Sequence, residues 1–516
     1  MMKSTSNSGM SLLPSSIEES RTIFDTLTLL PNPTKSRDQR NSYIKYVVTC
    51  STLSLLACAS TAYGFNVWLL PVSLSLYGPE ATYSMRNGMI LYSFSCQALI
   101  AGLVIEAFSS KIMKMNTGVA CAAATIIYPL GLVLSGLSLQ YASGVAAEVG
   151  FFLSQCIVCG IGLAVAIYTA QIGIITWFKE IDRSSLGASL FGFFAGFWPM
   201  AFSFWGPALV SHFGIYTSFY ITAVVIFIMT LPSIFLLRSP SEVPLQQGTQ
   251  PQQVDAGLEF ELEDDNDVTP DEQMQQSREK EGMENSPMLT RREFNRHPQA
   301  YIQFFVWIFT LTPGFAIKFT ISPLMNSVFD ASVKIQSTAS YIFLFFYAIS
   351  RLVTGMVVSH VKVFTVVMTS TITSFLCFFF VGAFVLNNLT STGWMWGFIT
   401  ANIVIASSLG AGKVCISLVS LELWGVNNMP RMVARAVFAL TFAAFIGPLF
   451  IWLGLSYPGN IYLDSTLNSA QQKAELEQSV GIALLVLGVI GFAGFTGHLL
   501  CVKPHRPSTR RIGVAS

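Results

Sequence analysis

Arg351 is the one charged residue in the stretch 341–358, where every other side chain is apolar, aromatic, small or hydroxylated. A charge near the centre of a bilayer costs about 2.5–3.5 kcal/mol on insertion scales, so a chain keeps one there when an anion offsets it. A guanidinium group is a planar fork of donors that matches a carboxylate. The anion is therefore either a carboxylate of the protein or a passing solute.

Carboxylates that could pair with Arg351 inside the protein are few. Glu106, Glu148 and Glu422 lie near the predicted ends of apolar segments. Arg351 lies roughly 21 Å from the outer end of its own segment, at about 1.5 Å per residue. A carboxylate at a segment end would have a long reach to Arg351, so our hypothesis is that Arg351 binds the substrate.

Three further residues are candidates for the same site. Tyr347 precedes Arg351 by one helical turn and shares its face, so its hydroxyl could donate to a bound carboxylate. Tyr168 in a glycine-rich segment is a second hydroxyl donor, and Lys318 would add a cation that suits a dianion or an anion-exchange cycle. The structural alternatives stay open: a tyrosine packed with its hydroxyl satisfied locally, or a lysine that snorkels to the headgroups.

Lys413 follows Gly412 in a glycine-containing run that is similar to a phosphate-binding loop. Val414 stands where such a loop needs Ser or Thr, so we expect no nucleotide site. The prediction for Lys413 is that it snorkels or pairs with Glu422.

Catalytic and metal-binding patterns do not emerge from the sequence. The chain has five histidines, none paired with a carboxylate at useful helical spacing. We expect no enzyme, no metal and no cofactor. The net charge of +1 gives no reason to expect a nucleic-acid partner.

The composition indicates the elements that position these residues. Of the 516 residues, 52% are hydrophobic and 11% charged, against about 25% charged in soluble domains, so the lipid bilayer is the expected surrounding. We predict an all-α membrane protein with twelve transmembrane helices, each of roughly 20 residues or more, in two six-helix halves. The predicted spans are 46–72, 87–108, 115–138, 146–176, 186–211 and 214–237, then 300–323, 337–359, 363–386, 393–420, 432–455 and 479–502.

The predicted parts of the chain are a disordered tail 1–45, a first half 46–238, a linker 239–298, a second half 299–502 and a tail 503–516. The linker is polar and carries the acidic run 259–267, so it lacks the apolar residues for a core. Lys and Arg gather in both tails and in alternate turns. The positive-inside rule therefore places both termini and the linker in the cytoplasm.

A short element recurs in the two halves. The second span ends with Gly102 and Glu106, followed by Lys111, and the eighth ends with Gly355, followed by Lys362. We interpret these residues as a structural or gating motif. Two parallel halves of this kind form a substrate site at their interface, near the bilayer midplane.

The 6+6 layout resembles the major facilitator superfamily over nearly the whole chain, and two segments resemble its monocarboxylate transporter and oxalate/formate antiporter branch. These are Gly160, Gly162, Tyr168, Trp177-Phe178, Arg183, Gly187, Gly192 and Gly196, and then Pro313-Gly314, Ser322-Pro323 and Arg351 to Gly355. The resemblance implies alternating access and an Arg351 that binds the substrate carboxylate.

The chain departs from that branch at three places. Tyr347 stands where proton-coupled carriers place an aspartate, and the first span reads Tyr63 to Trp68 without their lysine. Arg431 and Arg435, at the start of the eleventh span, are the nearest candidates for the second basic residue of the antiporters. Proton symport, exchange and facilitated diffusion all stay open.

The predicted function is secondary active or facilitative transport of a small organic anion, a mono- or dicarboxylate, with a proton or a counter-anion as coupling partner. The alternatives are a transporter of amino acids or other zwitterions and a membrane sensor or scaffold that moves nothing. Asp25, Leu29 and Leu30 fit an acidic dileucine signal read by sorting adaptors. The plasma membrane is the default location and the endolysosomal membrane the alternative.

Overall fold

The computed structural model describes residues 43–78, 83–179, 181, 183–238, 289, 291–387, 389, 391–456 and 469–501. Every regular element in these ranges is a helix. The sorting residues Asp25, Leu29 and Leu30 lie outside them, as do most of the predicted linker and both tails.

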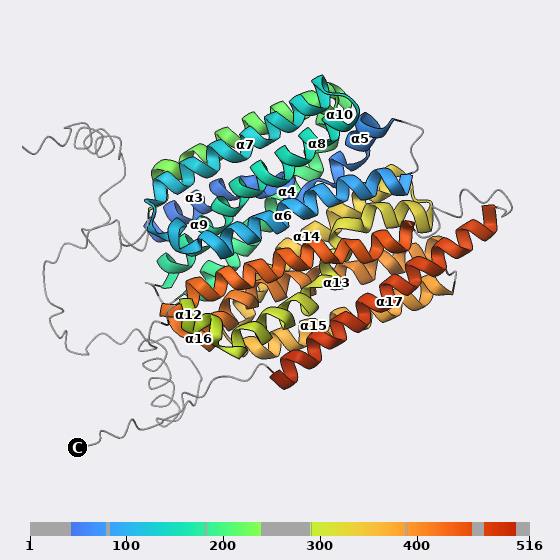
Figure 1. Ribbon diagram of the computed structural model, residues 1–516. Helices are drawn as coiled ribbons and strands as arrows, with labels where there is room; N and C mark the ends of the chain where they lie inside the picture. Colours follow the sequence, from blue (N-terminus) through green and yellow to red (C-terminus); the bar gives the residue numbers. More distant parts are fainter. Residues whose placement is uncertain are drawn as a thin grey trace, which may run out of the picture.

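The described part of the first half contains eleven helical segments, some of which follow one another end to end, and its long helices run side by side in Figure 1. Their bounds are η1 Tyr43–Val48, α3 Thr49–Leu55, η2 Leu56–Cys58, α4 Ala59–Gly64, α5 Asn66–Tyr77, α6 Tyr83–Lys114, α7 Thr117–Tyr141, α8 Gly144–Phe152, η3 Leu153–Val158, α9 Cys159–Lys179 and α10 Ser184–Leu236. The second half begins with the short α12 Arg291–Arg296. It continues with α13 Pro298–Phe329, α14 Val333–Val357, α15 Val363–Leu386, α16 Thr392–Ser456 and α17 Ser469–Cys501.

Eleven helices of the described chain are long and apolar enough to cross a membrane. One of them, α10, contains Gly214 at φ 76° and ψ 171°, a backbone conformation that glycine adopts readily and that interrupts the helix. The break separates the predicted spans 186–211 and 214–237, so α10 crosses twice. The two spans of α16, Gly393–Trp424 and Asn428–Leu455, are already counted separately among the eleven. The prediction of an all-α protein with two six-helix halves is confirmed.

The first span is divided into short segments, with a 3-10 turn at Leu56–Cys58 and a break at Phe65. Gly64 lies beside this break, where an added Cβ would stand 3.0 Å from the carbonyl oxygen of Pro199 in α10. The first span therefore packs closely on the fifth, and Tyr63 is held at the centre of the bundle.

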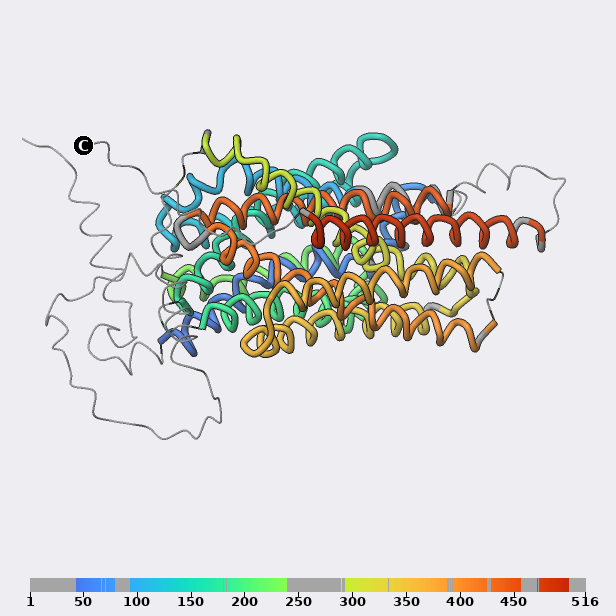
Figure 2. The backbone as a smooth tube through the Cα atoms, turned by 90° about the horizontal axis from the view of Figure 1, so that it is seen from below, coloured from blue at the N-terminus to red at the C-terminus, as the bar shows by residue number. Residues whose placement is uncertain are grey.

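The two halves meet along two helix pairs, α6 with α16 and α10 with α14. In Figure 2 the helices of both halves run along one common direction. Gly102 of α6 lies against Thr441, and Gly355 of α14 lies against Ser189; a Cβ at either glycine would overlap the facing side chain. The repeated glycine thus marks equivalent crossings between the halves, as small residues do in membrane bundles.

One end of the bundle is marked by α12, and we call it the α12 side (Figure 1). There the Trp177 indole donates to the carbonyl oxygen of Arg238 at 2.6 Å. Phe294 of α12 packs edge-on to Trp424 of α16, with ring centroids 5.1 Å apart. The opposite end is called the far side.

Candidate functional site

Arg351 lies in α14 with 2% of its surface exposed. Its guanidinium donates to the carbonyl oxygen of Gly192 in α10 and to the hydroxyl of Tyr347. Its Nε atom has no hydrogen-bond partner among the described residues. The ion pairs among the described residues are Arg435–Glu106 and Lys473–Asp330, so in this part of the chain no carboxylate pairs with Arg351.

Lys318 of α13 is 1% exposed and turns into the bundle instead of toward the headgroups. Its Nζ lies 4.1 Å from the ring centroid of Tyr63 and 4.4 Å from that of Tyr347. No hydrogen-bond partner reaches this Nζ within the described chain. The structure therefore brings Lys318 together with Arg351 and Tyr347.

Lys413 of α16 joins the same group, and the prediction that it snorkels or pairs with Glu422 is wrong. Its Nζ lies 4.7 Å from the ring centroid of Phe315 and 5.0 Å from that of Tyr63. Glu422 is exposed at the α12 side, about 13 Å along the helix from Lys413. Position along the helix suggested a headgroup contact, but the helix face that carries Lys413 points to the interface between the halves.

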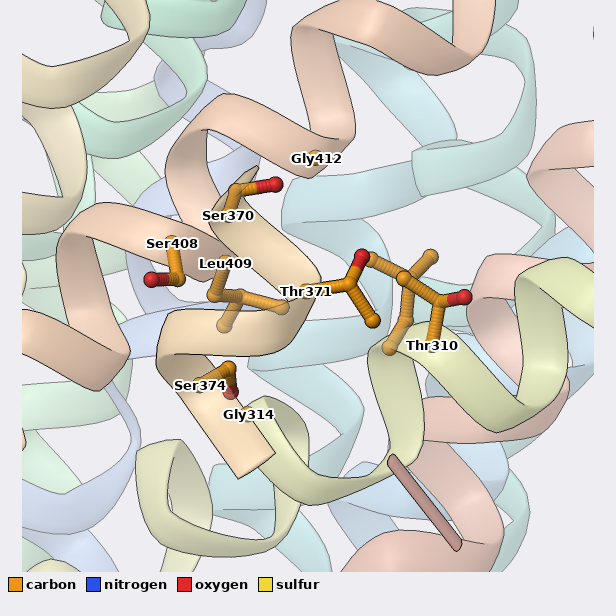
Figure 3. Close-up of a pocket in the computed structure, with 9 residues that line it drawn as sticks. Thr310, Gly314, Ser370, Thr371, Ser374, Ser408, Leu409 and Gly412 are labelled. Carbon is orange, nitrogen blue, oxygen red and sulfur yellow. The ribbon is translucent and has the colours of Figure 1, made fainter. Parts of the chain in front are cut away.

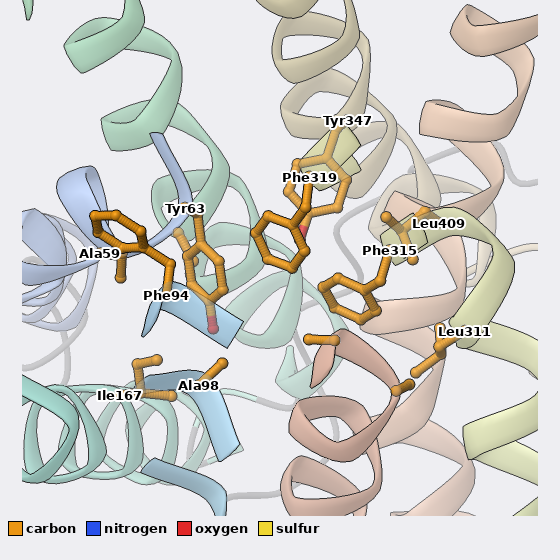
Figure 4. Close-up of a cluster of buried hydrophobic side chains, with 14 of the residues drawn as sticks. Ala59, Tyr63, Phe94, Ala98, Ile167, Leu311, Phe315, Phe319, Tyr347 and Leu409 are labelled. Carbon is orange, nitrogen blue, oxygen red and sulfur yellow. The ribbon is translucent and has the colours of Figure 1, made fainter. Parts of the chain in front are cut away.

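We call Lys318, Arg351 and Lys413 the cation cluster. They extend from three helices of the second half, and Figure 4 shows the rings of Tyr63, Phe319, Tyr347 and Phe315 gathered where these helices meet the first half. A cation over an aromatic face gains about 0.5–2 kcal/mol. Taking an ion out of water costs several kcal/mol, so the rings offset only part of that cost. Three basic side chains at one site can bind an anion through charge-assisted hydrogen bonds.

Tyr168 is not part of the cation cluster. It is buried in α9, and its hydroxyl donates to the carbonyl oxygen of Pro430 in α16 at 3.3 Å. Close by, the Gln171 amide donates to the Ser417 hydroxyl at 2.9 Å. Both bonds connect the first half to the second, so in this structure Tyr168 holds the halves together.

The motif residues also lie at the junction of the halves. Glu106 of α6 accepts a hydrogen bond from Arg435 of α16 at 3.1 Å. Arg435 was considered as a substrate ligand, but in this structure it is paired with Glu106. Arg431 donates to the carbonyl oxygen of Leu289, next to α12. Lys111 is exposed beyond the end of the junction.

Two aromatic residues of the site were missed at the level of the sequence. Tyr63 and Phe315 lie in apolar helices rich in aromatic residues, and no spacing distinguishes them from core residues. Trp68 of the same span as Tyr63 packs on Phe219 within the first half, with ring centroids 4.0 Å apart.

A small cavity between α13, α15 and α16 is lined by Thr310, Thr371 and Ser408, among others (Figure 3). None of the three cations lines it. The hydroxyls of Thr310 and Thr371 donate to carbonyl oxygens of their own helices, at 2.8 Å in both cases. The cavity is therefore separate from the charged site.

The fold and the central charged site define a polytopic membrane transporter with two helical halves. A family model described as Major Facilitator Superfamily matches residues 127–450, more than half of the chain. The chain belongs to this superfamily, and it is a transporter and not an enzyme.

Solved structures agree with this fold. The D-xylose–proton symporter aligns over 90% of this chain and 98% of its own, with a TM-score of 0.61 and 13% identity. A superfamily proton:xylose symporter bound to 6-bromo-6-deoxy-D-glucose aligns over 90% and 97%, with a TM-score of 0.62 and 14% identity. At these identities the likeness shows the fold alone. No curated protein sequence matches the chain significantly.

Proposed function

We propose that this superfamily transporter carries a small organic anion, a mono- or dicarboxylate. The observation that carries the proposal is the cation cluster: the buried Lys318 and Arg351 lie with the half-buried Lys413, and none of the three has a carboxylate partner among the described residues. An anion that enters replaces the water lost by these cations and lowers the cost of closing the halves around them.

The roles of the site residues follow from their chemistry. Arg351 binds one carboxylate through its fork of donors, and the neighbouring hydroxyl of Tyr347 adds a hydrogen bond. Lys318 and Lys413 are point charges that bind a second carboxylate group or help to neutralise the first carboxylate group. The site therefore favours a dianion over a neutral solute, although the aligned symporters have titles that name sugars.

The test is uptake into proteoliposomes of radiolabelled lactate, pyruvate, formate, oxalate, succinate and malate, with alanine and D-xylose as contrasts. We expect saturable uptake of at least one carboxylate, and little of the sugar. Arg351→Gln should lower kcat/KM by about 100-fold because two charge-assisted hydrogen bonds are lost, and Arg351→Lys should lower it less.

Arg183→Gln is the matched control, since Arg183 is an exposed arginine at the α12 side. It should transport as the unmodified protein does. Uptake of alanine alone would support a zwitterion carrier, and a folded protein that moves none of these solutes would support a sensor or scaffold. Equal transport by Arg351→Gln and the unmodified protein would show that Arg351 does not bind the substrate.

A further inference from the structure

A carrier that moves net solute must return with its site unoccupied, and during that return its cations have no substrate anion beside them. Lys318 and Arg351 are nearly shut from solvent in the structure, so it represents a closed conformation of the site. Water has little access to these two charges there, and the described residues provide no carboxylate for them. Whatever contacts the cations in this state sets the cost of closing without substrate.

Aromatic faces contact the cations in the structure. The negative face of a ring attracts a cation without carrying charge itself. Tyr347 and Phe315 belong to the second half and move with the cations. Tyr63 belongs to the first half, and its ring lies 4.1 Å from the Nζ of Lys318 and 5.0 Å from that of Lys413.

Tyr63 is therefore the ring that meets the cations only when the halves close on one another. The other described contact from the first half is the carbonyl oxygen of Gly192, which accepts from Arg351. The two lysines thus have a single first-half ring, Tyr63, in common among the described residues.

We propose that the Tyr63 ring is a placeholder for the substrate anion, which stabilises the closed empty carrier and so permits its return without solute. The inference rests on the proposed function. In the loaded carrier the anion contacts the lysines, and the ring is dispensable. Tyr63 is then a positioning residue that sets the ratio of net transport to exchange.

The experiment compares two fluxes in proteoliposomes loaded with a labelled carboxylate that the unmodified protein transports. Efflux into anion-free buffer requires the empty carrier to return, whereas efflux into buffer with the unlabelled anion does not. Tyr63→Leu should slow net efflux by about ten-fold and leave exchange within about two-fold, because only the empty carrier loses its ring contact. Tyr63→Phe retains the ring face and should match the unmodified protein in both fluxes.

Phe65→Leu is the matched control. Phe65 also reaches the second half, with its ring centroid 5.4 Å from that of Phe319, but no cation lies over its ring among the described contacts. Loss of this ring should affect both fluxes alike. Equal slowing of both fluxes by Tyr63→Leu, or a selective loss of net efflux in Phe65→Leu, would overturn the inference. So would an unmodified protein with exchange and no net efflux.

Thermal unfolding of the detergent-purified protein gives a second readout. Without anion, Tyr63→Leu should unfold at a lower temperature than Tyr63→Phe, and a saturating transported carboxylate should reduce that difference. An unchanged difference would contradict the placeholder role. If the unmodified protein transports no carboxylate at all, both the proposed function and the inference fail. If it transports a carboxylate but Tyr63→Leu leaves the ratio of net efflux to exchange unaltered, only the inference fails.

Discussion

At the scale of single residues, Lys413 shows how a position along a helix can mislead. Its neighbours Gly410 and Gly412 are small, and Gly410 lies against the backbone of Tyr347, where an added Cβ would stand 2.6 Å from the carbonyl oxygen. This close approach brings Lys413 to the ring of Tyr347 at 5.5 Å. The lysine is thus held inside the bundle by the glycines that precede it.

Removal of either lysine should weaken anion binding, because each contributes a charge in a region with little water. We expect Lys318→Met and Lys413→Met to raise the KM for a transported dicarboxylate by about ten-fold or more, with a smaller effect on a monocarboxylate. Lys334→Met removes an exposed lysine at the far-side start of α14 and should change neither value. Unchanged KM in both site variants would show that the lysines do not bind substrate.

At the scale of elements, the apolar runs predicted nearly all the helices, since about 20 apolar residues have few other structures open to them in a bilayer. Tyr347 was predictable as a neighbour of Arg351, because i, i+4 spacing fixes a face, whereas Lys318 was open between this site and the headgroups. Tyr63 and Lys413 were not predictable, because which face of a helix meets the other half depends on packing between distant segments.

The glycine crossings make a prediction about packing. Gly102→Ala should push α6 away from Thr441 of α16 and slow transport, since the added Cβ overlaps that side chain. Gly393→Ala is the control, because nothing lies within 4 Å of its added Cβ. Melting temperature in detergent and uptake rate are the measurements. A Gly102→Ala protein with both values unchanged would mean that the crossing tolerates a wider spacing.

At the scale of the whole molecule, Glu106 and Arg435 form an ion pair that connects the two halves. Arg435 also donates a hydrogen bond to Asn295 of α12 at 2.6 Å. Glu106→Gln should loosen the α12 side, and faster hydrogen exchange in residues 428–441 would report it. The charge swap of Glu106→Arg with Arg435→Glu should restore part of the protection. Exchange that is unaltered in Glu106→Gln would show that the pair does not hold the junction.

The cation cluster lies entirely on helices of the second half, and this asymmetry has an electrical consequence. A charge that crosses the whole membrane field does work of about 2.3 kcal/mol per 100 mV. When the second half moves along the membrane normal, its three cations move with it, and the dianion of the proposed function would cancel most of their charge. The empty carrier is therefore the more voltage-sensitive form, so the resting potential of the membrane helps to set which way an unoccupied site faces.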